Sequence, residues 1–351
     1  MAICLITGSG GLIGSESVVF FSGKNFKVIG IDNDMRNEFF GKDASTREMV
    51  NRLKGELVKY THYNTDIRYK ERLRDIFAEF NKDIKLIIHA AAQPSHDWAA
   101  SDPQTDFAVN AVGTNNLLQL ALKFCPKTAF IYLSTNKVYG DLPNFLPLRE
   151  NKERWDLPPR HEFYNGISER MSIDRSTHSL FGVSKLAGDL LVQEYGNYFG
   201  MKTVCFRGGC LSGGKHQGVK LHGFLSYLMK CCIRKEQYTI YGYKGKQVRD
   251  NIHSADLAAA FYEFYKAPKK GEVYNIGGGR QNSCSILQAI RACERICGNK
   301  MKYNYIDRPR KGDHKWYISD IGKFKRDYPA WKQKYGLEGI LGDICDNLTS
   351  K

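Results

Sequence analysis

The sequence lacks several features that would place it outside the ordinary enzymes. It has no window of about eighteen consecutive apolar residues, so we expect no membrane-spanning helix. Its N-terminus enters an apolar run without a basic and apolar leader, so we expect no secretory signal. Internal repeats and low-complexity tracts are also missing. These absences favour a soluble cytoplasmic protein with no membrane partner and a conventional hydrophobic core.

The cysteines show no pattern of a metal site or a disulfide framework. None of the ten forms a CxxC pair, and Cys293 and Cys297, one helical turn apart, have no neighbouring histidine. We therefore expect reduced thiols and no metal.

The charge balance is strongly basic. The net charge of +15 comes from 52 lysine and arginine residues against 37 aspartate and glutamate residues. Such an excess favours nucleic acid, an acidic membrane or a phosphorylated small molecule as partner. The basic residues are dispersed, and no basic helix accompanies an aromatic-studded strand. We therefore expect a phosphate-rich small substrate and no nucleic-acid partner.

The segment TGSGGLIG at residues 7–14 is the most informative motif. It lies between an apolar run and an amphipathic segment, which predicts a strand, a glycine turn and a helix. Three glycines at a spacing of three allow a tight turn and a close approach of a pyrophosphate to the helix N-terminus. A second strand, at 27–31, ends at Asp32, whose carboxylate can accept both ribose hydroxyls. That acid would repel a 2′-phosphate, so the pattern favours NAD over NADP.

Alternating strand and helix patterns continue and predict an α/β fold with a doubly wound parallel sheet of the Rossmann type. Further strands are expected at 57–62, 84–89, 129–133 and 202–206, and helices at 69–80, 104–122 and 181–199. Residues 141–178 are rich in proline and charge and predict a long surface excursion beside the site.

After residue 206 the patterns become shorter and mixed, with helices expected near 222–234, 255–265 and 283–297. We therefore expect a NAD-binding domain over 1–206, with a strand and a helix returning to it near 240–265. A smaller, interleaved C-terminal α/β substrate domain is expected mainly over 207–351.

Polar residues follow two of the predicted strands, at 89–96 and 133–140, and open a predicted helix, at 178–185. In open α/β sheets ligands bind at such places. Here the chain resembles the extended short-chain dehydrogenase/reductase superfamily, in particular its nucleotide-sugar epimerases and dehydratases. The resemblance covers nearly the whole length and is carried by TGSGGLIG, NTDIR, HAAAQ, FAVNAVGTNNLL, STNKVYG, the segment ending at Lys185, and RDNIHSADLA. STNKVYGDL, YFGMKTVCFRGGCLSGG and GYKGKQVRDNIHSADL are most similar to the subgroup that epimerises C2 of CDP-linked deoxysugars.

The resemblance implies a role for individual residues. The residues implied to bind NAD are Gly8, Gly10, Gly11, Leu12, Ile13, Gly14, Asp32, Asn33, Asp66, Ile67, Ala90, Ala91, Ala92, Gln93, Asn110, Ser134 and Lys185. Those implied to bind substrate are Gln93, Ser95, His96, Thr135, Asn136, Cys210, His222, Arg249 and Arg310. Thr135 would hydrogen-bond the sugar hydroxyl that is oxidised, Lys185 would hold the nicotinamide ribose, and the two arginines suit a diphosphate because their planar fork pairs with two oxygens.

One departure affects the chemistry. Members of the superfamily carry a tyrosine, as general base, four residues before the lysine, and this chain has Phe181 there. Phenylalanine has no ionisable proton, so three alternatives stay open. Another group supplies the base, the chain is a weakly active or non-catalytic relative, or the proton leaves through Thr135 and water. Candidates for a replacement base are Cys210, whose thiol near Lys185 could have a lowered pKa, and His96, His178, Tyr164, His222 and His253, each of which also has a structural interpretation. Tyr139 is expected to be packed.

The reaction implied by the resemblance is epimerisation of a nucleoside-diphosphate sugar by transient hydride transfer to bound NAD. A 4-epimerase, a dehydrogenase or reductase, and a non-catalytic dinucleotide-binding relative remain alternatives. A 4,6-dehydratase is disfavoured because Asn136 and Lys137, and no acid pair, follow Thr135. The resemblance also implies a homodimer through the helices at 104–122 and 181–199.

Overall fold

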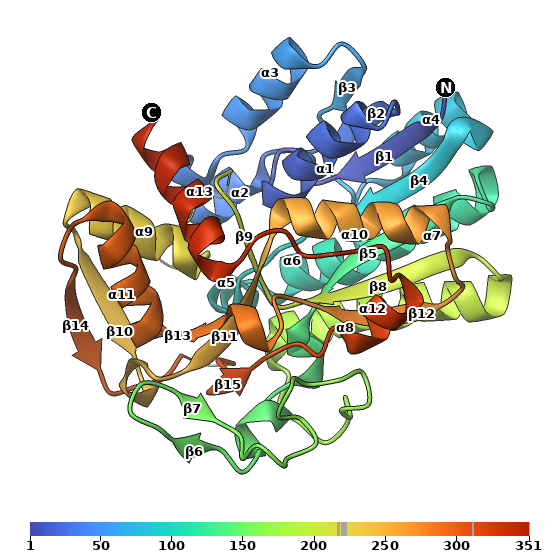
Figure 1. Cartoon of the computed structure of the whole chain (residues 1–351). Helices are drawn as coiled ribbons and strands as arrows, with labels where there is room; N and C mark the ends of the chain where they lie inside the picture. The colour runs from blue at the N-terminus through green and yellow to red at the C-terminus, as the bar shows by residue number, and fades with distance from the viewer. Residues whose placement is uncertain (216–217, 219–222, 311, 351) are drawn as a thin grey trace. The chain divides into compact units, whose positions relative to one another are not determined.

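The computed structural model describes residues 1–350 except 216–217, 219–222 and 311 (Figure 1). The chain divides into two compact units. The first unit comprises Met1–Thr135, Leu180–Arg207 and Leu257–Tyr274. The second unit comprises Asn136–Ser179, Gly208–Asp256 and Asn275–Lys351. The expected split of function between 1–206 and 207–351 stays a prediction.

The first unit is built on a seven-stranded sheet in the order β12-β8-β5-β4-β1-β2-β3. Its strands are β1 (Ile3–Thr7), β2 (Lys27–Ile31), β3 (Tyr60–Tyr63), β4 (Ile84–His89), β5 (Ala129–Thr135), β8 (Lys202–Gly208) and β12 (Glu272–Ile276). Strands β1 to β5 pair in parallel. The chain moves outward from β1 to β3 and then returns to β4 on the other side of β1. This reversal creates a topological switch point between β1 and β4, where ligands bind in such sheets.

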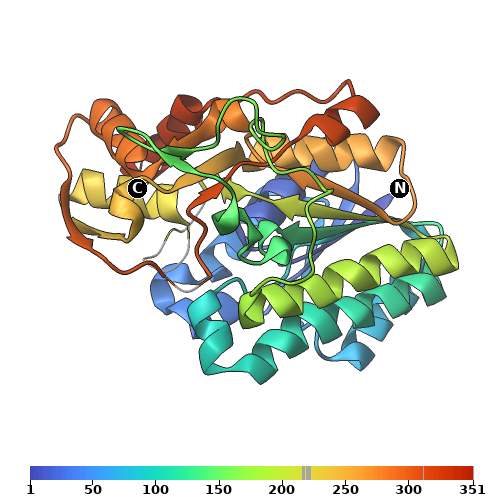
Figure 2. The ribbon, with the colours of Figure 1, turned by 90° about the horizontal axis from the view of Figure 1, so that it is seen from below.

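Helices cover the sheet and bury its apolar strands. They are α1 (Leu12–Gly23), α2 (Met35–Phe40), α3 (Arg47–Glu56), α4 (Lys70–Phe80), α5 (His96–Ser101), α6 (Pro103–Phe107), α7 (Gly113–Phe124), α8 (Ser179–Phe199) and α10 (Ser254–Lys266). Figure 2 shows α7 and α8 running side by side. Apolar side chains of α4, α7 and α8, among them Phe77, Leu117 and Val192, form one core with the strands. Strand residues on the opposite face, such as Ile6 and Val28, are buried as well, and burial on both faces explains why the strands are almost uniformly apolar.

The second unit contains short sheets and a group of packed helices. Its strands are β6 (Arg149–Glu150), β7 (Trp155–Asp156), β9 (Cys210–Ser212), β10 (Gln237–Tyr241), β11 (Val248–His253), β13 (Ser283–Ser285), β14 (Lys302–Ile306) and β15 (Trp316–Tyr317). Its helices are α9 (Phe224–Arg234), α11 (Ile286–Cys297), α12 (Gly322–Asp327) and α13 (Leu337–Thr349). A second core gathers buried residues of α9, α11 and α13, including Leu228, Ile290 and Ile340.

The predicted α/β class with a doubly wound sheet is confirmed, and several element boundaries were wrong. The strand expected at 57–62 begins only at Tyr60, because α3 extends to Glu56. The helix expected from 283 begins at Ile286, because residues 283–285 pair with β11 and the Ser285 side chain then caps the helix. Helices α2 and α3 were missed, and the 141–178 excursion contains the β6–β7 pair.

The structure also bears on the helix at 104–122, on the cysteines and on membrane-spanning helices. The helix expected at 104–122 is interrupted by a π-helical turn at Ala108–Val112, which carries Asn110. Such turns often mark functional sites. All ten cysteines are free thiols. Among the described residues no helix combines the length and apolar character needed to cross a membrane.

Candidate functional site

The glycine turn lies at the switch point and packs very tightly. Gly8 adopts φ +69° and donates its N–H to the Ile31 carbonyl at 2.7 Å. A Cβ on Gly8 would lie 2.8 Å from the Ala91 backbone nitrogen, and one on Gly14 would lie 1.9 Å from the Gly8 oxygen. Only glycine therefore permits the observed approach of α1 to β1 and β4.

The start of α1 provides the groups that a phosphate needs. Its N-cap residue is Gly11, which has no side chain to accept a bond from the first-turn N–H groups of Leu12, Ile13 and Gly14. A Cβ added to Gly11 would meet only the Gly8 oxygen, at 3.4 Å, so this face of the turn is open. An oriented set of N–H groups at the positive end of a helix fits a pyrophosphate.

Two acids flank the turn where the resemblance implies the adenosine half of NAD. Asp32 follows β2 and accepts hydrogen bonds from the Gly10 N–H and the Thr46 hydroxyl, both at 2.9 Å. Asp66 accepts from Asn33 Nδ2 at 2.9 Å and forms a salt bridge with Arg68. These bonds fix both carboxylates in place before any ligand binds.

The segment after β4 keeps small side chains close to the glycine turn. The Ala90 N–H donates to the Thr7 carbonyl at 3.2 Å, and the Ala91 N–H donates to the Thr7 hydroxyl at 3.3 Å. Ala90, Ala91 and Ala92 are all half-buried. Ile67 lies in the loop between β3 and α4 and packs on Gly113 of α7. A Cβ added to Gly113 would lie 2.7 Å from the Ile67 side chain.

Gln93 and Asn110 belong to a buried polar network. Gln93 Nε2 donates to Asp106 at 2.7 Å and to the Ser95 carbonyl at 2.9 Å, and the Gln93 N–H donates to Asn110 Oδ1 at 3.0 Å. Asn110 Nδ2 donates to Ser184 Oγ on α8 at 3.0 Å. Burial raises the pKa of Asp106. The described contacts of both amides are thus with the protein, and their expected contacts with ligand stay predictions.

Phe181 and Lys185 lie one turn apart on α8 and are both buried. The Phe181 ring meets the His96 ring edge-on, with centroids 4.9 Å apart. Lys185 Nζ donates to the Leu133 carbonyl at 2.7 Å, and burial lowers the pKa of this amine to about 7. At neutral pH the amine is therefore divided between its charged form and its neutral, proton-accepting form. Thr135 ends β5 and is half-buried.

A buried ion pair one helical turn from Lys185 was missed by sequence reasoning. Asp189, fully buried one turn after Lys185, pairs with Arg207 of β8 through bonds of 2.8 and 3.1 Å. It also accepts from Ser134 Oγ at 2.5 Å and from Gln193 Nε2 at 2.7 Å. The side chain of Ser134, predicted to contact NAD, thus faces Asp189. The sequence could have indicated this pair, because Asp189 follows Lys185 by four residues and therefore lies on the same face of the predicted helix.

In the second unit, charged groups gather around Asp313. Arg249 forms a short ion pair with Asp313, and Lys137 Nζ donates to the neighbouring Gly312 carbonyl at 2.7 Å. Arg249 and Lys137, with Arg310, act against burial and hold the pKa of Asp313 below its usual value. Arg310 lies over the Tyr241 ring at 4.6 Å. The group around Asp313 thus includes both arginines that were predicted to bind phosphate, together with Lys137. Burial lowers the pKa of Lys137 to about 8.

The idea that Cys210 has a lowered pKa is wrong. Burial raises the pKa of its thiol to about 12, so this group stays protonated at neutral pH. It sits on β9, which pairs with β11, the strand that carries Arg249.

The other candidate bases have structural partners in the second unit. The His253 ring stacks on Tyr335 at 3.8 Å and contacts Asp343 through Nε2 at 2.8 Å. His178 Nε2 lies 2.9 Å from the Val138 carbonyl. The Arg280 guanidinium lies over the Tyr164 ring at 3.6 Å. The buried Tyr139 donates its hydroxyl to Asn275 at 2.8 Å. Asn136 is buried in the turn after β5, and His222 lies outside the described residues.

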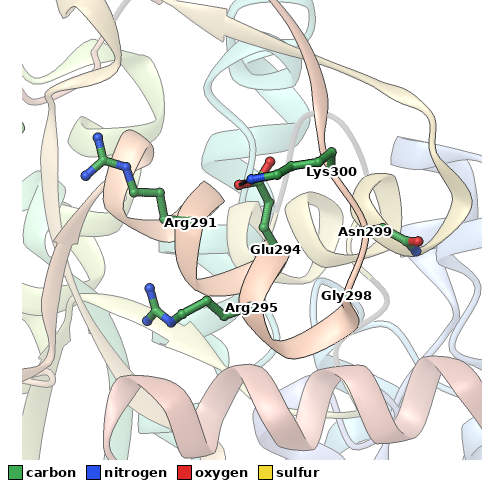
Figure 3. A pocket seen from close by; sticks show the side chains of 6 residues that line it. All are labelled: Arg291, Glu294, Arg295, Gly298, Asn299 and Lys300. Atoms are coloured by element: carbon green, nitrogen blue, oxygen red, sulfur yellow. Dashed lines mark hydrogen bonds and ion pairs between the residues drawn. The ribbon is translucent and has the colours of Figure 1, made fainter.

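A pocket of about 320 Å³ opens at the end of α11 (Figure 3). It is lined by Arg291, Glu294, Arg295, Gly298, Asn299 and Lys300 and contains none of the predicted site residues. Within the described part of the chain no group of three or more histidine, cysteine or acidic side chains is arranged to hold a metal ion.

Comparisons with known proteins agree with this geometry. The model of the NAD dependent epimerase/dehydratase family matches residues 4–277. CDP-paratose 2-epimerase of Salmonella typhi is 28% identical over 99% of both chains, and UDP-glucose 4-epimerase of Bacillus subtilis is 28% identical over 98% of this chain and 95% of that one.

Solved structures show the same fold. UDP-glucose 4-epimerase from Bifidobacterium longum, in complex with NAD+ and UDP, superposes with a TM-score of 0.80 at 22% identity, covering 100% of this chain and 99% of that chain. UDP-glucuronic acid 4-epimerase from Bacillus cereus, in complex with UDP-glucuronic acid and NAD, gives 0.78 at 23% identity over 99% of both chains. The matched family is NAD dependent, which confirms NAD as the cofactor. Because the family model matches most of the chain, and because the glycine turn lies at the switch point of the sheet, the chain belongs to the NAD dependent epimerase/dehydratase family.

Proposed function

We propose that this protein epimerises a nucleoside-diphosphate sugar, at C2 of a CDP-linked deoxysugar. The observation that carries the proposal is the similarity to CDP-paratose 2-epimerase along 99% of both chains. The resemblance to that subgroup is strongest in the segments after Thr135 and around Arg249. These segments also contain predicted substrate contacts. An epimerase specific for C4 is the alternative within the same family.

The residues around the glycine turn would hold NAD. The first-turn N–H groups of α1 would bind its pyrophosphate, Asp32 its adenosine ribose, and the alanines after β4 would let it pass close to the backbone. NAD, when bound, supplies the hydride acceptor and donor of the reaction. The clash that a Cβ on Gly8 would make with Ala91 supports this close approach of backbone segments.

Arg249, Arg310 and Lys137 would bind the diphosphate of the substrate. In the structure Asp313 already pairs with Arg249, so an incoming diphosphate would have to compete with this carboxylate. A diphosphate carries more charge and can use both arms of the guanidinium fork. Thr135, at the end of β5, would hydrogen-bond the hydroxyl on the reacting carbon.

We assign the proton-accepting role to Lys185. It lies one turn from Phe181, the position where the resemblance implies a tyrosine, and burial keeps its pKa near 7. A neutral amine can take the hydroxyl proton while its N–H groups keep the bond to the Leu133 carbonyl. Activity should therefore rise with pH through about 7.

Two substitutions separate this role from simple electrostatics. Lys185→Arg keeps a positive charge but has no titrating lone pair, so turnover should fall by about 10²–10⁴-fold while bound NAD is retained. Phe181→Tyr introduced into Lys185→Arg should restore part of it, because a phenol replaces the lost base. Full activity of Lys185→Arg would refute the assignment and leave His96, in contact with Phe181, as the next candidate.

The function itself is tested with CDP-, UDP-, GDP- and dTDP-sugars in deuterated water, with the ring protons followed by NMR. A new epimer without deuterium at the inverted carbon means that the same hydrogen left and returned, and it identifies the sugar. Deuterium at that carbon would contradict the hydride mechanism.

The absence of a tyrosine at position 181 favours one second candidate, a dinucleotide-binding protein without turnover. This candidate would be supported if the unmodified protein converts none of the tested nucleotide sugars and the Phe181→Tyr variant gains strong activity.

We also propose a cytoplasmic homodimer formed through α7 and α8. Val183 and Leu190 of α8 are 48% and 42% exposed although apolar, which suits a helix face that packs on a partner. Light scattering after size-exclusion chromatography tests it, and a monomeric mass at micromolar protein would contradict it.

A further inference from the structure

Two cysteines of the second unit are in contact although 65 residues separate them in the sequence. The Sγ atom of Cys232, near the end of α9, lies 2.7 Å from the Sγ atom of Cys297, the last residue of α11. Cys232 is fully buried, and Cys297 is partly exposed. A disulfide needs the sulfurs at about 2.05 Å, so only a small movement separates this contact from a bond.

The residue Asn299 connects this thiol pair to the surface. Cys232 Sγ lies 3.5 Å from the Asn299 carbonyl, and Asn299 Nδ2 donates to the Cys232 carbonyl at 3.4 Å. Asn299 also lines the pocket at the end of α11 (Figure 3). Neither cysteine lines the pocket itself, so Asn299 is the residue that links the pocket to the thiol pair.

The two thiols differ in their access to solvent. Burial, together with the neighbouring Cys297 thiol, raises the pKa of Cys232 to about 12, which disfavours Cys232 as the thiol that attacks a solute first. Cys297 is the thiol that a solute can approach. The order of reaction is thereby set: Cys297 attacks first and Cys232 resolves.

We infer that Cys232 and Cys297 form a reversible oxidation site that uses a low-molecular-weight disulfide as its oxidant. The Cys297 thiolate attacks one sulfur of the small disulfide, whose S–S bond breaks and releases one thiolate. Cys232 then loses its proton and attacks the Cys297 sulfur of the mixed disulfide, releasing the second thiolate. The two released thiolates take up the two protons lost by the protein. The net change oxidises two protein thiols to one disulfide and reduces one small disulfide to two thiols.

The bond would tie α9 to α11 within the core that these helices share with α13. Closing a loop of 65 residues restricts the unfolded chain, so the oxidised protein should melt at a higher temperature than the reduced one. This site needs neither NAD nor a sugar and stands independently of the proposed activity.

The test incubates the native, full-length protein with oxidised glutathione, blocks remaining thiols by alkylation and maps the peptides by mass spectrometry. We expect a peptide pair joined through Cys232 and Cys297, a protein mass lower by about 2 Da, and reversal by excess reduced glutathione. The inference is overturned if both cysteines are recovered alkylated, or if the joined peptides involve other cysteines.

Three variants check the order of attack. Cys232→Ser should stop at the mixed disulfide, with one glutathione on Cys297, and Cys297→Ser should give no reaction at this pair. Cys345→Ser removes a partly exposed thiol of α13 in the same core and serves as the matched control, in which the bond should still form. Glutathione found on Cys232 in Cys297→Ser would refute the assigned order.

Discussion

The buried pair of Asp189 and Arg207 allows a stability prediction whose size follows from the structure. Asp189 is fully buried and accepts four hydrogen bonds, two of them from Arg207. In Asp189→Asn the shape is kept, but one acceptor becomes an amide NH₂ and the Arg207 charge stays buried without a counter-ion. Breaking such a pair from one side costs about 3–5 kcal/mol of unfolding free energy.

Urea denaturation measures this loss, with an unchanged dependence on urea showing that the compactness of the two states is the same. Glu56→Gln is the matched control, because it removes the same charge from an exposed pair with Arg52. That pair should be worth only about 0–1 kcal/mol. If Asp189→Asn loses no more stability than the control, the argument from burial is wrong.

Two further measurements follow from the same contacts. Replacing both partners by apolar residues, in Asp189→Leu with Arg207→Met, should recover most of the loss, because no unpaired charge then remains. Burial lowers the pKa of Lys185 and Asp189 partly opposes this, so Asp189→Asn should move the pKa of Lys185 further down. NMR titration of a ¹³C-labelled lysine side chain detects that shift, and an unchanged pKa would show that the two groups do not interact.

The remaining predictions concern other contacts. Gly14→Ala should unfold the protein or cost at least about 1–3 kcal/mol because its Cβ would overlap the Gly8 oxygen, whereas Gly11→Ala should fold and lose NAD affinity, as denaturation and NAD binding would show. Lys185 has a folded pKa near 7 against 10.5 when unfolded, so between these values the unfolded chain binds more protons and stability rises with pH. Relative to Lys185→Met, the protein should gain about 2 kcal/mol between pH 7.5 and pH 9 in urea denaturation, and a flat difference would contradict burial of the amine. The hydrogen bond to His253 holds the pKa of Asp343 low, so this contact should stabilise the protein above about pH 4 and fade as pH falls, with Asp343→Asn insensitive to that change.

Much of the proposed NAD site could be predicted from the sequence because its parts are close together along the chain. Strand β1, the glycine turn, α1 and β2 with Asp32 follow one another within residues 3–32. Alternation of strands and helices then predicts the parallel sheet, and the carboxyl ends of its strands predict where the ligand lies. The boundaries were predicted wrongly where a few residues could join either of two elements. Residues 283–285, for example, pair with β11 and leave Ser285 to cap α11.

Tertiary structure alone decided which polar groups are used by the protein itself. Asp189, Arg207 and Ser134 come from two strands and a helix, and they meet only when those elements pack. Gln93 and Asn110, read as ligand contacts, are engaged in a network with Asp106 that no spacing reveals.

The protonation of the side chains proposed for catalysis was also beyond the sequence. A lysine four residues after Phe181 is visible in the chain, but its pKa near 7 results from burial among side chains distant in sequence. The same cause acts in the opposite direction on Cys210, where burial disfavours the charged thiolate. The sequence by itself determined the fold and the family, because glycine spacing and apolar periodicity are local. Which groups are charged, paired or in contact, as with Cys232 and Cys297, was decided only by packing, because burial and contact between remote residues exist only in the folded chain.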